Sequence, residues 1–296
     1  MKQIRLQMNL MFKSLEFQIA LFIMTLFSIG SFFDSVYESA GQSYNRLFDA
    51  ECYICSVSGY SGILWQVLLP VVPVLVFATS YIKEKKNSNL TLMIQRGTCR
   101  DYFLSKILVN GFGIIIVMGL PIILNYALCC IYFPHNEYSF NWASRIYRDD
   151  LLAGRNLLYE TDRPAMLFAN LYCRNPWIYQ VVLFLLFLLF ALAIGSFALC
   201  LSFRFPQSRL LLFVPSLLMT RGLLYVDAYA YTRAMENPGY IYRDYNLIEY
   251  LEPFPAMAGM HLEYLLLFFV AILGFCIISF KWAVHRQEQI LIGGMV

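Results

Sequence analysis

Six long runs of apolar residues decide what this chain can fold into. They cover residues 15–33, 63–82, 107–133, 177–203, 210–226 and 264–284. A helix needs about 20 apolar residues to cross the hydrocarbon core of a bilayer, which is roughly 30 Å thick. Only 14% of the residues are charged, against about 25% in a typical soluble domain. The sequence therefore predicts a single transmembrane domain over residues 1–296 with six membrane-spanning helices.

The fifth run is the shortest, and Arg221 interrupts it. At about 1.5 Å per residue this arginine lies roughly 16 Å beyond Leu210, near the middle of a bilayer, where an unpaired cation costs at least a few kcal/mol. Glu263, at the start of the last run, is a candidate partner. One interpretation is that Arg221 and Glu263 line the exit half of a transport cavity. The alternatives are a structural ion pair and an arginine that extends to the interface from a shallower helix.

Lysines and arginines collect on one side of the predicted spans. With a cytoplasmic N-terminus, the segments on that side hold 13 of the 22 basic residues, including every lysine, and four acidic residues. That side then carries a net charge of +9 and the opposite side −6. Because basic residues favour cytoplasmic segments, both termini are predicted to be cytoplasmic.

Residues 1–14 form an amphipathic pattern before the first span. Ile4, Met8 and Met11 recur at helical spacing, whereas Arg5 and Lys13 fall on the opposite face. This pattern predicts a basic interfacial helix on the membrane surface. A plain positively charged flank of the first span explains the same residues equally well.

The connection between the second and third spans, residues 83–105, has the pattern of an elbow. An apolar stripe is formed by Leu90, Met93 and Ile94. Gly97 can adopt the left-handed conformation that ends a helix, and Thr98 with Asp101 is a capping-box signature that begins the next one. Lys106 is expected to extend to the lipid boundary as that helix enters the membrane. The elbow presents a short helix to a soluble partner, although an amphipathic loop on the bilayer surface would look similar.

This elbow resembles the coupling segment of the permease subunits of type-2 ABC transporters, an export-type family with six transmembrane helices. The stretch from Gln95 to Lys106 reads QRGTCRDYFLSK. Family members carry an acidic residue after the second span, a short coupling helix, an arginine-rich turn, an aromatic residue and a lysine. The matching residues are Glu84, Arg96, Arg100, Tyr102 and Lys106. The segment FANLYCRNPWIYQ before the fourth span and Pro215 within the fifth are a second similarity.

The resemblance implies a coupling site that binds a separate ATPase subunit through Glu84, Leu90, Met93, Ile94, Arg96, Arg100, Tyr102 and Lys106. The chain has no G-x-x-x-x-G-K-[ST] motif, so ATP and Mg²⁺ are expected on that partner. The expected complex contains two ATPase copies and a second permease, identical or related, within a bacterial plasma membrane and its lipid. Substrates would be amphiphilic peptides, drugs or lipid-like molecules. No catalytic residue, bound metal or nucleic-acid partner is expected in this chain.

Two features depart from the family pattern, namely the length of residues 134–176 and the residues that follow Glu84. Residues 134–176 are long and charged, and we expect a folded extracellular helical cap there, the alternative being a solvated helical hairpin without a ligand. The resemblance also implies an outer re-entrant segment over residues 227–261. In the coupling segment, Asn87 and Ser88 replace the usual Gly-Thr pair.

Two other classes of function stay open on the sequence. A membrane sensor or scaffold for immunity or resistance could use the same elbow with an ATPase and transport nothing. An intramembrane enzyme is less consistent with the residues, because His261 lacks the H-E-x-x-H spacing of a zinc hydrolase and no G-x-S-x-G motif is present.

Overall fold

The computed structural model describes most of the helical part of the chain. The described residues are 2–42, 47, 50, 53–54, 63–87, 89–95, 97–134, 168, 171, 175–206, 210–236 and 262–293. Their regular elements are all helices: α1 (Lys2–Phe12), α2 (Leu15–Glu38), η3 (Leu64–Leu68), α4 (Leu69–Phe77), α5 (Ser80–Lys86), α6 (Asn89–Gln95), α7 (Cys99–Ile114), η4 (Ile115–Gly119), α8 (Leu120–Tyr132), α12 (Pro176–Arg204), η5 (Leu210–Leu212), α13 (Phe213–Glu236) and α14 (Leu262–Gly293). The predicted all-helical class is confirmed for this part.

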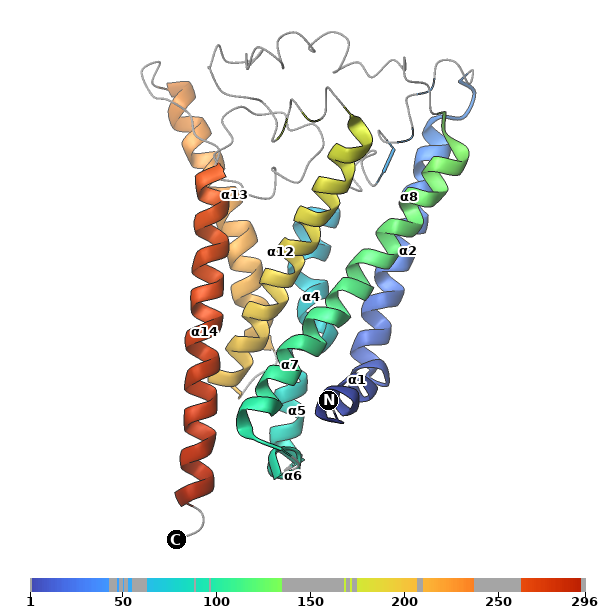
Figure 1. The fold of residues 1–296 in the computed structure, drawn as a ribbon. Coiled ribbons are helices and arrows are strands. Elements are labelled where there is room, and N and C mark those ends of the chain that lie inside the picture. Colours follow the sequence, from blue (N-terminus) through green and yellow to red (C-terminus); the bar gives the residue numbers. More distant parts are fainter. Residues whose placement is uncertain are drawn as a thin grey trace.

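Five helical stretches are long and apolar enough to cross a bilayer. They are Leu15–Glu38, Gln66–Lys86, Cys99–Tyr132, Trp177–Arg204 and Glu263–Ile290. They run between two ends of one bundle (Figure 1). We call the end at which α1, α5 and α6 lie the α6 end. The fold is therefore a multi-pass membrane bundle, as the apolar runs predicted.

The fifth apolar run differs from its prediction, because α13 is not among the five candidate spans of the described residues. The run does fold into a helix beside the others (Figure 1). However, α13 contains Arg221 and extends through Asp227 and Arg233 to Glu236, so its apolar part is short. Residues 227–236 thus continue a helix rather than begin a re-entrant segment. The rest of that segment, 237–261, and most of the predicted cap over residues 134–176 lie outside the described residues.

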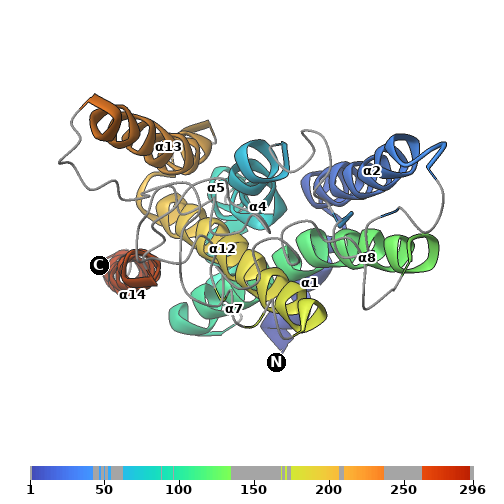
Figure 2. The same cartoon turned by 90° about the horizontal axis from the view of Figure 1, so that it is seen from above.

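α1 lies across the bundle rather than in line with α2 (Figures 1 and 2). The chain turns at Ser14, whose hydroxyl accepts a hydrogen bond from the Phe17 backbone N–H at 3.3 Å and so caps α2. One face of α1 packs against α7, and Gln7 and Met11 on that face are fully buried. Arg5 on the opposite face is exposed. The predicted amphipathic helix is present, and its apolar face binds the rest of the protein.

Glycines allow the central helices to approach closely. α12 packs against α4, α7 and α14. A Cβ atom added to Gly195 of α12 would collide with the Ile114 side chain and lie 3.1 Å from the Pro73 carbonyl oxygen. Small residues at such crossings bring helix backbones together, which replaces the missing hydrophobic driving force between helices in lipid.

We expect Gly195→Val to lower the free energy of unfolding by about 1–3 kcal/mol, because an overpacked core must shift side chains and backbone. Gly274→Val on α14 is the matched control, since a Cβ atom there meets nothing within 4 Å. Both changes replace a helical glycine with the same residue, so intrinsic helix propensity cancels. Unfolding in mixed detergent micelles measures the difference, and equal losses for the two variants would contradict the packing argument.

Candidate functional site

The elbow between the second and third candidate spans is built from α5, α6 and α7. At its second bend, Thr98 has an extended backbone and its hydroxyl accepts a hydrogen bond from the Asp101 N–H at 3.0 Å. The predicted helix start is therefore confirmed. Gly97 is not left-handed; among the described glycines only Gly41 has a positive φ. A Cβ atom at Gly97 would lie 2.5 Å from the Gln3 side-chain oxygen of α1, so a larger residue would require that flexible side chain to move.

The apolar stripe of α6 faces the bundle. Leu90 is 8% exposed and Ile94 is 3% exposed, both within the hydrophobic core, and Met93 packs against that core. The Met93 carbonyl oxygen accepts a hydrogen bond from Gln3 Nε2 at 3.0 Å, so α1 also contacts α6. The outward apolar side chain is Leu92, which is 58% exposed. α6 is therefore held by one face and offers the other to its surroundings.

A buried charge cluster centred on Lys106 lies between α5 and α7, the helices that precede and follow α6. The Lys106 ammonium donates hydrogen bonds to Glu84 Oε1 at 2.8 Å, Ser80 Oγ at 2.9 Å and Gln7 Oε1 at 3.4 Å. Tyr102 donates its hydroxyl hydrogen to the other carboxylate oxygen of Glu84. We call these five residues the Lys106 cluster. All three ammonium hydrogens have an acceptor, which is the condition for burying a lysine.

Lys106 does not extend to the lipid boundary as predicted. Its side chain is fully buried and lies over the aromatic rings of Phe77 and Tyr102, with the nitrogen 4.8 and 5.3 Å from their centroids. Because Glu84 arrives at the same depth from the preceding span, an ion pair inside the protein replaces contact with water. The carboxylate, the hydroxyl groups and the ring faces together compensate the cost of desolvating the ammonium group.

The Lys106 cluster joins three helices that are separate in the sequence. Ser80 and Glu84 come from α5, Tyr102 and Lys106 from α7, and Gln7 from α1. A second ion pair, between Lys83 and Glu16, joins α5 to α2. These contacts tie the helices on either side of α6 to each other and to α1 and α2.

The remaining predicted coupling residues are not part of this cluster. Arg100 is exposed on the first turn of α7, and Arg96 lies outside the described residues. Sequence reasoning named Glu84, Tyr102 and Lys106 but missed Gln7 and Ser80. Ser80 precedes Glu84 by one helical turn, so the spacing of α5 could have indicated it. Gln7 is 99 residues away from Lys106 and carries no local signal.

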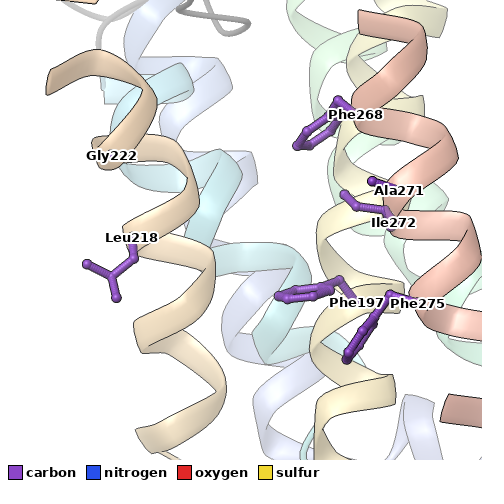
Figure 3. A pocket seen from close by; sticks show the side chains of 7 residues that line it. All are labelled: Phe197, Leu218, Gly222, Phe268, Ala271, Ile272 and Phe275. Atoms are coloured by element: carbon purple, nitrogen blue, oxygen red, sulfur yellow. The ribbon is translucent and has the colours of Figure 1, made fainter. Parts of the chain in front are cut away.

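The predicted pair of Arg221 and Glu263 is not formed. Arg221 Nη1 donates a hydrogen bond to Gln66 Oε1 at 3.1 Å, and the arginine is exposed. Glu263 is exposed on the first turn of α14. Close to Arg221, an apolar groove of about 440 Å³ opens between α12, α13 and α14 (Figure 3). Its lining residues are Phe197, Leu218, Gly222, Phe268, Ala271, Ile272 and Phe275.

Comparisons of this chain with family models, curated proteins and solved structures found no match.

Proposed function

We propose that this chain is the permease subunit of an ABC transporter and couples ATP hydrolysis in a separate ATPase subunit to export of an amphiphilic substrate. The observation that carries this proposal is that α6 is fixed to the bundle by one face and exposed on the other. A short helix lies at the bend between two candidate spans and is anchored by Leu90 and Ile94, and the Lys106 cluster joins the two helices on either side of it. An exposed Leu92 points away from that anchor.

In the proposed mechanism the ATPase binds α6 and moves it when its nucleotide sites close. Because α5 and α7 are joined through Lys106 and Glu84, the two spans would tilt as one body. Rigid-body motions of this kind are a common means of transmitting a local change across a protein. ATP and Mg²⁺ would be bound by the ATPase alone, and two ATPase copies would act on two permeases, identical or related.

Purification of the native complex in mild detergent tests the proposal. We expect an ATP-hydrolysing subunit to co-purify, and reconstituted proteoliposomes to move a labelled amphiphilic peptide or lipid only when ATP is supplied. Co-purification and ATP hydrolysis without movement of any amphiphile would favour the sensor function instead. Isolation of the chain with no ATPase would contradict both.

The proposal places the α6 end in the cytoplasm, where the positive-inside rule also places it. A fluorescent protein fused after Val296 should therefore be fluorescent, and alkaline phosphatase fused there should be inactive. The reverse result is expected for both reporters fused after Pro134, at the other end of the third candidate span. Active phosphatase at the C-terminus would contradict the orientation.

A further inference from the structure

We propose that the groove between α12, α13 and α14 binds one acyl chain of an anionic phospholipid, with the lipid phosphate held by Arg204 and Arg286. This inference requires only that the bundle lies in a membrane and is independent of the proposed transport function. The groove lies along the membrane-spanning part of α14, and every side chain that lines it is apolar. Figure 3 shows Phe197, Phe268 and Phe275 along the groove, with Gly222 on the opposite helix.

The groove leads to a cationic site at the α6 end. Phe275 lines the groove and also lies beneath the Arg204 guanidinium, 5.7 Å from it. Arg204 lies 5.6 Å from the Trp282 ring centroid, and Arg286 lies 5.0 Å from the same centroid. Two guanidinium groups therefore flank one tryptophan at the end of an apolar groove. Tryptophan is typical of the membrane–water interface, and arginine of phosphate recognition.

Two polar atoms at this site have no hydrogen-bond partner within the described residues. Arg204 Nε is buried and donates to no acceptor there, and the buried hydroxyl of Ser279 is also unpaired. Ser279 is one helical turn from both Phe275 and Trp282 on α14. Neither arginine forms an ion pair with a described carboxylate. Arg204 as a whole is half-buried, so its guanidinium can still take an acceptor that the described residues do not supply, and a phosphate oxygen is suitable.

The length of the site matches one lipid leaflet with its headgroup region. From Trp282 to Phe268 the rise along α14 is about 21 Å, and half of a bilayer that includes its headgroups is about 20–22 Å thick. A headgroup beside Trp282 would therefore lay its chain along Phe275 and Phe268, towards the middle of the bilayer. A helix from a second copy could fill the groove, but its apolar side chains would leave both guanidinium groups without an anion.

Brominated lipids give the test, since bromine on an acyl chain quenches the fluorescence of a nearby tryptophan. The full chain is reconstituted in phosphatidylcholine vesicles that contain either dibrominated phosphatidylglycerol or dibrominated phosphatidylcholine. The quenching of Trp282 is obtained as the difference between the tryptophan quenching of the wild-type chain and that of the Trp282→Phe variant. We expect phosphatidylglycerol to bind several-fold more tightly, Arg286→Gln to reduce this preference about fivefold, and the double variant with Arg204→Gln to abolish it, whereas Arg204→Lys should retain most of it.

A pair of glycine variants tests the acyl-chain part of the site. Gly222→Phe should reduce quenching by both brominated lipids, because the new ring occupies the groove. Gly274→Phe should leave quenching unchanged; a Cβ atom at either glycine meets nothing within 4 Å, but only Gly222 lines the groove. Equal affinity for the two lipids in the wild-type chain, or a preference that Arg286→Gln leaves unchanged, would overturn the proposal. Arg286 is exposed, so loss of the fold does not complicate that variant.

Discussion

Replacing Lys106 with methionine is expected to lower the free energy of unfolding by about 3–5 kcal/mol, because it leaves a charged partner buried without its counter-ion. The Glu84 side chain is only 11% exposed and would keep Tyr102 as a donor but lose the ammonium group. Methionine is close to lysine in length, so the apolar contacts with Phe77 largely remain. Equilibrium unfolding of the purified chain in mixed detergent micelles measures the loss.

Two further variants separate the buried charge from other effects of the change. In Lys106→Met combined with Glu84→Gln, no carboxylate is left uncompensated, and we expect much of the lost stability to return. Lys281→Met removes an exposed lysine and should change stability by less than about 0.5 kcal/mol. If Lys106→Met and Lys281→Met lower the free energy of unfolding by the same amount, the buried ion pair does not hold α5 against α7.

Leu92→Asp is expected to weaken binding of the ATPase by about 30-fold or more and to reduce ATP-driven transport accordingly. A buried apolar anchor at an interface contributes roughly 2 kcal/mol or more when truncated, and a charge adds a desolvation cost. Leu92 is the residue to change because it is 58% exposed, whereas Leu90 belongs to the core. Substitutions at Leu90 would mix loss of the partner with loss of the fold. Co-purification and the ATP hydrolysis rate of the complex report the effect.

Ile290→Asp is the matched control for this experiment. Ile290 is 55% exposed on the last turns of α14, at the same end of the bundle as α6 (Figure 1). The same charge is thus introduced at a similarly exposed aliphatic residue outside the elbow. Unchanged hydrolysis in both variants, or equal losses in both, would show that α6 is not the docking element.

The membrane class of the fold could be predicted from the sequence because runs of about 20 apolar residues are typical of membrane-spanning helices. Five of the six runs became candidate spans. The remaining run, the fifth, over residues 210–226, could be recognised as a helix but not as a span. Its helix α13 continues into Asp227 and Arg233, and no local signal showed where the helix would end.

Those features of the elbow that depend on residues close together in the sequence could be predicted. The Thr98 cap depends on a contact three residues away. The close approach of Gln3 to Gly97 and the burial of Lys106 against Gln7 and Glu84 depend on residues that are not near in the sequence. Helical spacing likewise grouped the apolar stripe of α6 on one face but could not say whether that face turned inward. Those features depend on how α1 packs, which periodicity does not determine.

The most direct test of the proposed coupling is a photo-crosslink from α6 in native membranes. A photoreactive amino acid in place of Leu92 should form a covalent adduct with an ATP-hydrolysing subunit, and the same amino acid in place of Ile290 should form much less of it. Adducts from position 92 to lipid alone, or an ATPase that crosslinks only from position 290, would contradict the account.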